Sequence, residues 1–129
     1  MILVLRGCVT KVFDDACRDD EVHISPVDTR ESNCKTFFIR NTLDQGLWFM
    51  TWSGPVNDFD VAVFTSFMYV PPGHITPQLL SQVINNKFAP VTFAGYITDG
   101  SAPTVGKIEI WTAQSNNVFR TQKRRRGWI

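Results

Sequence analysis

The sequence NDFDVAVFTSFMYVPPGHITP, residues 57–77, is the stretch from which we predict the fold. Side chains at every second position between 59 and 69 are apolar apart from one threonine, and the intervening positions are mixed. This period-two pattern is typical of a β-strand that turns one face toward a core. Pro71, Pro72 and Gly73 end the strand, because proline lacks a ladder donor and glycine permits a sharp turn. We therefore expect a long central strand, interior to its sheet and closed by a rigid corner. Its apolar set is Phe59, Val61, Val63, Thr65, Phe67 and Tyr69.

Shorter strand patterns lie on both sides of this stretch. A helix is expected at one place, 76–84, where Thr76 can cap, Pro77 suits the first helical position and four apolar residues share a face. Seven or eight short strands with regular turns and one short helix predict an all-β protein, an antiparallel β-sandwich. The other strands are expected at 2–13, 22–27, 36–41, 47–52, 91–97 and 107–112.

Length and composition limit the class of protein. With 129 residues, 43% hydrophobic and 19% charged, the chain predicts one folded domain and excludes a disordered or collagen-like chain. Its three cysteines are an odd number without C-x-x-C spacing, which favours a reduced, intracellular folding compartment over a disulfide framework. Apolar runs stay shorter than the roughly 18 residues that span a bilayer, so we expect a soluble protein.

The net charge of +1 conceals a basic end. Five of the thirteen cations lie within seven residues near the C-terminus, and the rest of the chain carries eight cations against twelve acids. We interpret 1–119 as the sandwich domain and 120–129 as a basic tail. The tail suits phosphate, or the acidic run 14–21 of another copy, and its alternative role is to aid solubility. The residues predicted to contact nucleic acid or a neighbouring subunit are Arg120, Lys123, Arg124, Arg125, Arg126 and Trp128.

Catalytic motifs are few. Cys34 with His23, or Cys8 with His74, would form a nucleophile pair only if the fold brought the two side chains together. The sequence contains no G-x-S-x-G or H-E-x-x-H motif, and isolated histidines and cysteines are most often structural. We therefore expect a protein that is not an enzyme.

Metal and ligand sites are also weakly indicated. The spacing of Cys17, His23 and Cys34 matches no recognised ligand set. The acidic run 14–21 lacks the glycine turn of a calcium loop, and we interpret it as a solvated loop. The run 47–52 (LWFMTW) predicts a strand buried on both sides, with an apolar cavity for a small hydrophobic ligand as the alternative. No metal or cofactor is expected.

Several of these segments resemble a known family. FMYVPPG at 67–73, followed by Pro77, resembles the strand and corner of capsid proteins of picornaviruses and picorna-like viruses, especially their largest surface coat protein. WSGPVNDFDV at 52–61 is similar to the segment that leads into the preceding strand. Shorter similarities occur at 88–91 with Gly95 and Tyr96, at 106–111 and at 124–126, so the resemblance covers 52–129.

The resemblance implies an eight-stranded jelly roll that self-assembles with other coat subunits into a shell around RNA. It places the protein in the virion, and in the host cytoplasm during assembly. Some family members hold a fatty-acid-like molecule in the sandwich, and many bind a host receptor. This chain is shorter than typical coat proteins and has a curtailed outer loop at 99–106. The corner of Pro71, Pro72, Gly73 and His74 is expected to contact a neighbouring subunit.

Two alternatives remain open at this point. The first is a small β-fold module that binds RNA or DNA through the basic tail. The second is a lectin-like or ligand-binding sandwich that uses exposed aromatic side chains.

Overall fold

The structure, a computed structural model, describes residues 5–30, 32, 34–84 and 89–117. This part of the chain forms eight β-strands and one short 3-10 helix, η1. The strands are β1 (Leu5–Asp15), β2 (His23–Asp28), β3 (Cys34–Asn41), β4 (Leu47–Gly54), β5 (Val63–Val70), β6 (Leu79–Ile84), β7 (Val91–Thr98) and β8 (Ile108–Asn117), and η1 spans Phe59–Val61.

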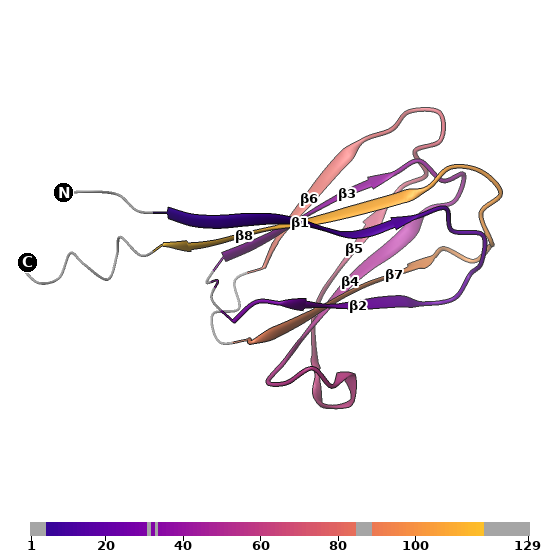
Figure 1. Ribbon diagram of the computed structural model, residues 1–129. Coiled ribbons are helices and arrows are strands. Elements are labelled where there is room, and N and C mark those ends of the chain that lie inside the picture. Colours follow the sequence, from indigo (N-terminus) through magenta and orange to yellow (C-terminus); the bar gives the residue numbers. More distant parts are fainter. Residues whose placement is uncertain (1–4, 31, 33, 85–88, 118–129) are drawn as a thin grey trace, which may run out of the picture.

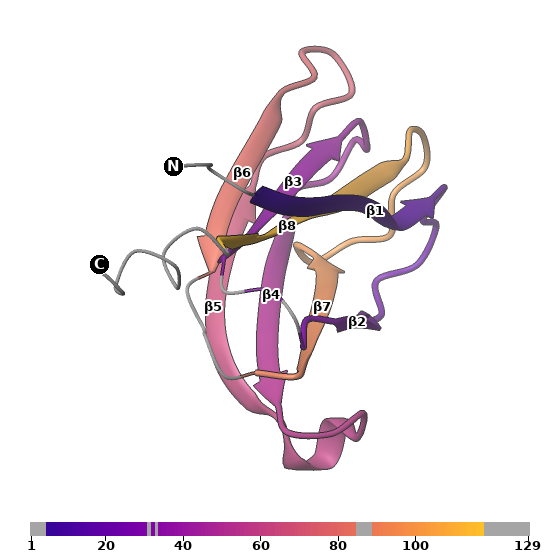
Figure 2. The same cartoon turned by 60° about the vertical axis from the view of Figure 1, so that its left-hand side comes forward.

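The strands build two four-stranded sheets that pack face to face (Figures 1 and 2). Sheet A has the order β1-β8-β3-β6 and sheet B the order β2-β7-β4-β5, and the paired strands are antiparallel. Every connection except that between β4 and β5 crosses from one sheet to the other. An eight-stranded double sheet with these crossings is a jelly roll. The predicted all-β antiparallel sandwich is confirmed.

The core lies between the sheets and is formed by every second residue of the strands. Inward-facing residues of four strands are fully buried: Phe37 and Ile39 of β3, Leu47 and Phe49 of β4, Ala94 and Tyr96 of β7, and Ile108 and Ile110 of β8. Each such pair is two residues apart, as one face of a strand requires.

The predicted helix at 76–84 is wrong, because residues 79–84 form strand β6 at the edge of sheet A. Leu80, Gln82 and Ile84 alternate toward the interior, whereas Leu79 and Val83 are exposed. The helix was predicted from the types and spacing of the side chains, which do not reveal backbone pairing with a distant strand. The strand is stabilised by backbone pairing with β3, a partner about forty residues away in sequence.

The predicted central strand is also wrong in its start and its position. Residues 59–61 form η1, which Asp58 caps by accepting a hydrogen bond from the backbone N–H of Asp60. Strand β5 begins at Val63 and lies at the edge of sheet B, paired with β4 on one side. The corner at Pro71, Pro72 and Gly73 follows β5 as expected. The connection that carries η1 extends away from both sheets (Figures 1 and 2).

Candidate interaction surface

Sheet B presents an aromatic outer surface. Across β4 and β5, Trp48 lies opposite Tyr69, and Trp52 lies opposite Phe64. We call the following residues the aromatic face: Trp48, Trp52, Phe59, Phe64, Phe67, Tyr69 and Phe93.

The rings of the aromatic face touch one another in an unbroken series. Centroid distances along it run 5.2 Å (Tyr69–Trp48), 5.6 Å (Trp48–Phe67), 6.1 Å (Phe67–Phe64), 5.7 Å (Phe64–Trp52), 5.0 Å (Trp52–Phe59) and 5.4 Å (Phe59–Phe93). All pairs but Phe64–Phe67 are tilted by more than 50°, so the rings meet mostly edge to face. Such contacts stabilise aromatic clusters. The face is therefore a packed apolar layer with an uneven surface.

Strand β5 carries most of the exposed part of this layer. Phe67 is 60% exposed, Phe64 49% and Tyr69 40%. The strand, VFTSFMYV, contains no charged residue and no proline. Edge strands are usually protected by lysine, proline or a covering segment, because their free backbone groups pair with other chains. Among the described strands only β4 pairs with β5, so the second edge of β5 and its outward rings are both available to another chain.

The outer surface of sheet A carries a charged cluster and no comparable row of rings among the described residues. Glu109 of β8 is buried beneath three cations: Arg40 Nη2 lies 2.6 Å from its carboxylate, Lys11 Nζ 2.8 Å and Lys107 Nζ 3.7 Å. Hydrogen bonds from Lys11 and then Arg40 lower the pKa of the Glu109 carboxyl below its ordinary value. The Lys11 and Arg40 side chains also lie over the ring of Trp111. Charged groups thus satisfy one another over β1, β3 and β8, whereas the edge strand β6 exposes the aliphatic Leu79 and Val83 and sheet B exposes rings.

The Pro-Pro-Gly corner is partly an intramolecular joint. Gly73 is buried and donates its N–H to the Leu43 carbonyl at 3.2 Å, and a Cβ at this position would collide with the Asn41 carbonyl. Asn41 donates a side-chain hydrogen bond to the Pro71 carbonyl at 3.1 Å. Pro71, Pro72 and His74 are exposed and therefore accessible to a neighbouring subunit. The contact itself stays a prediction.

The structure tests some of the other predicted sites but not all of them. The basic residues 120–126 and Trp128 lie outside the described residues. Cys34 pairs in β3 with Ser115, near the Asp28 end of β2, and His23 begins β2 at its opposite end. The proposed Cys34–His23 pair is therefore not formed. The Cys8–His74 pair is not tested, because the side chain of Cys8 is not among those described.

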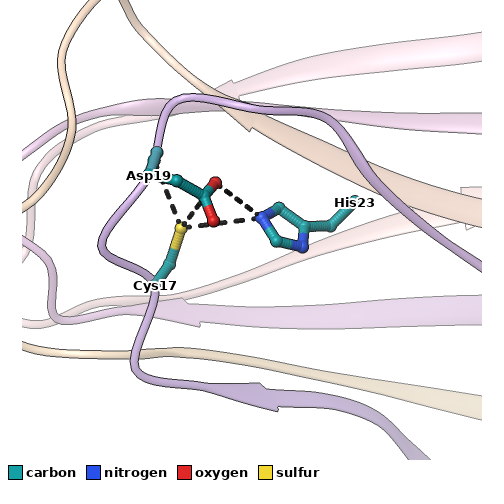
Figure 3. A group of neighbouring side chains, drawn as sticks. All are labelled: Cys17, Asp19 and His23. Carbon is teal, nitrogen blue, oxygen red and sulfur yellow. Dashed lines mark hydrogen bonds and ion pairs between the residues drawn. The ribbon is translucent and has the colours of Figure 1, made fainter.

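His23 instead lies beside Cys17 and Asp19 (Figure 3). Its Nε2 is 2.8 Å from Asp19 Oδ1 and 3.9 Å from Cys17 Sγ, and the thiol also lies 3.8 Å from Asp19 Oδ1. The hydrogen bond from His23 is the main cause that lowers the pKa of the Asp19 carboxyl. The sequence pattern suggested Cys17 and His23 together with Cys34, but it gave no sign of Asp19, which is one of five carboxylates in the acidic run 14–21.

Comparison with known proteins gives information on the fold and not on the family. No family model matches the chain, and no curated protein sequence matches it. The structure is similar to the PBSX exported protein XepA, with a TM-score of 0.63 and 12% sequence identity, over 83% of this chain and 36% of that one. The chain thus spans about a third of the length of XepA. At this identity, the similarity shows the fold alone.

Two further structures are less similar. One is a protein of Bacillus endospore appendages, described as a novel family of disulfide-linked pili (TM-score 0.48, 14% identity, 89% of this chain and 88% of that one). The other is from infectious bursal disease virus, Gx strain (TM-score 0.44, 12% identity, 88% of this chain and 32% of that one). Both TM-scores are too low to establish a shared topology. Within the ranges that the structure describes, no helix combines the length and apolar character needed to cross a bilayer.

Proposed function

We propose that the protein is a structural subunit of a viral shell and that its aromatic face binds a neighbouring subunit. The observation that carries the assembly part of this proposal is the uncharged edge strand β5 with its exposed rings. Burying one such ring against a partner contributes about 1.5–3 kcal/mol. A continuous row of them accounts for a stable contact without any added charge pair.

The viral part of the proposal is supported by two observations. Residues 67–73 resemble the strand and corner of picornavirus coat proteins, and the strand order is that of a jelly roll, a fold that many capsid proteins use. In this proposal the protein belongs to the virion, and the basic residues at 120–126 balance the charge of enclosed RNA. Fold alone does not assign function, because lectins share this architecture.

Sugar binding is the second candidate, because a row of exposed rings is also a surface on which sugars stack. The ring geometry favours assembly. Coplanar neighbouring rings would give a sugar chain a continuous platform, whereas all but one of the neighbouring pairs here are tilted by more than 50°. Tilted rings leave ridges and hollows that the side chains of another protein can fill.

Sedimentation velocity over a wide range of concentration tests the proposal. Wild type is expected to associate, alone or mixed with its co-subunits, and Phe67→Asp to weaken association at least tenfold by placing a charge at the centre of the face. Val9→Asp is the matched control, since it puts the same charge at an exposed apolar position on an edge strand of the other sheet. A wild type that stays monomeric throughout, or equal effects of both substitutions, contradicts the proposal. Tryptophan fluorescence that responds to sugars in wild type, and loses this response in Trp48→Phe, would favour the lectin alternative.

A further inference from the structure

The segment between β1 and β2 carries three chemically different side chains that converge on one point. It joins sheet A to sheet B, and it contains Cys17 and Asp19, with His23 at the first position of β2. Their potential ligand atoms all lie within 4.8 Å of one another. Figure 3 shows the thiol and the carboxylate both directed at the same edge of the imidazole.

This arrangement is not that of a catalytic triad. In a triad the nucleophile contacts one ring nitrogen of histidine, and the carboxylate accepts a hydrogen bond from the other, which fixes the tautomer and stabilises the imidazolium that forms. Here Cys17 and Asp19 both approach Nε2 of His23. Three potential ligand atoms within 4.8 Å of one another can instead surround a single metal ion.

The distances suit a small tetrahedral ion. Zinc binds sulfur at about 2.3 Å and nitrogen or oxygen at about 2.0–2.2 Å, which places neighbouring ligand atoms roughly 3.3–3.6 Å apart. The observed separations are 2.8 Å for His23 Nε2 to Asp19 Oδ1, 3.8 Å for Cys17 Sγ to Asp19 Oδ1 and 3.9 Å for Cys17 Sγ to His23 Nε2. To reach the tetrahedral spacing, each of these separations has to change by about 0.6 Å or less.

The surroundings hold each ligand in place. The ring of Tyr96 stacks on His23 at 4.9 Å with an angle of 12°, and the Thr98 hydroxyl donates to the Asp19 carbonyl at 3.5 Å. Arg18 donates to the carbonyls of Cys17 (2.7 Å) and Gly106 (3.0 Å), which ties the segment to the turn before β8. These contacts hold the backbone of Cys17 and Asp19 and the ring of His23, and so limit how far the three ligand atoms can move.

The site is also reachable from solvent on one side. Cys17 is 5% exposed, whereas the side chains of Asp19 and His23 are 46% and 31% exposed. A buried thiol with two half-exposed partners leaves room for a fourth ligand, such as water, on the outer side.

We propose that Cys17, Asp19 and His23 bind one zinc ion or a similar divalent transition metal, with water as the fourth ligand. The mixed sulfur, nitrogen and oxygen set selects zinc-like ions over calcium or magnesium, which take oxygen ligands. The bound metal ties the β1–β2 connection to the first residue of β2 in sheet B. The proposal does not depend on assembly or on the viral assignment.

Titration of the untagged, chelator-stripped and reduced chain with Co²⁺ and Zn²⁺ tests it. We expect one ion per chain, a visible Co²⁺ spectrum with the charge-transfer band of a thiolate ligand, and a higher melting temperature with Zn²⁺. Cys17→Ser should abolish the charge-transfer band. Asp19→Asn should weaken binding at least 100-fold, beyond the roughly 10- to 100-fold loss typical of an outer-shell partner. Because Asp19 is half exposed, this variant tests the site even if Cys17→Ser fails to fold.

Matched controls separate this site from adventitious binding. Cys34→Ser and His74→Ala remove the same residue types from other parts of the fold and should leave stoichiometry and spectrum unchanged. Equal binding by wild type and Asp19→Asn, or a wild-type Co²⁺ spectrum without thiolate character, overturns the proposal.

Discussion

Phe64 stacks against Phe67, although the two residues are three positions apart on one strand. Their ring centroids are 6.1 Å apart with an interplanar angle of 24°. In a regular strand, residues separated by three point to opposite faces. Here Thr51 pairs with Ser66 and Trp52 with Phe64, so Thr65 is an extra residue, a β-bulge. The bulge reverses the alternation and brings Phe64 onto the same outer surface as Phe67.

The bulge is held by a hydroxyl cluster, which leads to the first prediction. Thr51 Oγ1 is fully buried and lies 2.6 Å from Ser66 Oγ and 2.8 Å from Thr65 Oγ1. Thr51→Val keeps the shape but removes the buried hydroxyl that half-buried Ser66 and exposed Thr65 contact, so we expect the free energy of unfolding in urea to fall by about 0.5–1.5 kcal/mol. The double variant with Ser66→Ala should lose less than the sum of the two single variants. Strict additivity would show that the hydroxyls do not cooperate.

The second prediction concerns the exposed position of β5. Phe67→Ala should change the free energy of unfolding by less than about 1.5 kcal/mol, because the ring loses only two aromatic contacts at a surface. Phe49→Ala, one strand away but fully buried, should cost about 3–5 kcal/mol. Chemical denaturation of the two variants measures both values. A loss at Phe67 as large as that at Phe49 would mean that the aromatic face is covered within the monomer.

The third prediction tests the Pro-Pro-Gly corner. Gly73→Ala drives a methyl group into the Asn41 carbonyl, and we expect a loss of about 2 kcal/mol or more in stability. Gly54→Ala is the control, because the nearest atom to its added Cβ lies 3.4 Å away and the change should cost less than about 1 kcal/mol. Thermal and urea unfolding of both variants measure the two losses of stability. Similar losses in Gly73→Ala and Gly54→Ala would argue against close packing at Gly73.

The fourth prediction is a pH dependence at Glu109. Its pKa in the folded state lies below the ordinary value of 4.5, through hydrogen bonds from Lys11 and Arg40. A lowered folded pKa stabilises the protein at pH values above the unfolded pKa, and this contribution is lost as the pH falls through the folded pKa. Glu109→Gln should therefore cost roughly 1–2 kcal/mol at neutral pH and almost nothing in strong acid.

Unfolding of Glu109→Gln and wild type in urea between pH 7 and pH 2 measures this difference. Asp99→Asn removes the same charge from an exposed turn and serves as the control. A constant gap between wild type and Glu109→Gln across that range would show that the substitution acts through packing and not through the carboxylate charge.

Local patterns were sufficient for most of the strands. The runs at 36–41, 47–52 and 91–97 fall within β3, β4 and β7, because the alternation of buried and exposed side chains is written directly in the sequence. The run 47–52 was expected to be buried on both sides, yet Trp48 is exposed, because the outer surface of sheet B has no second layer over it among the described residues. Pattern predicts a strand, but it does not tell what covers each face.

Candidate sites were harder to predict, because they depend on residues brought together by pairing. Three carboxylates of the acidic run 14–21 have different partners in the structure. Asp14 forms ion pairs with Lys11 and Lys107, Asp15 accepts a hydrogen bond from Tyr96, and Asp19 is hydrogen-bonded to His23. None of these partners could be chosen from spacing alone. The i to i+4 spacing of Asp19 and His23 was the one signal available, and it has meaning only in the turn that the fold imposes.

By itself, the sequence determined an antiparallel β-sandwich with a sharp corner after residue 70, because strand period and proline-glycine chemistry act over a few neighbouring residues. The tertiary structure alone decided that β5 is an edge with its rings outward, that 79–84 is a strand, and that Cys17, Asp19 and His23 share one point. Each of these outcomes depends on which backbone groups pair across the sheets. Such pairing joins residues far apart in the chain, so its energy is invisible to any short window of sequence.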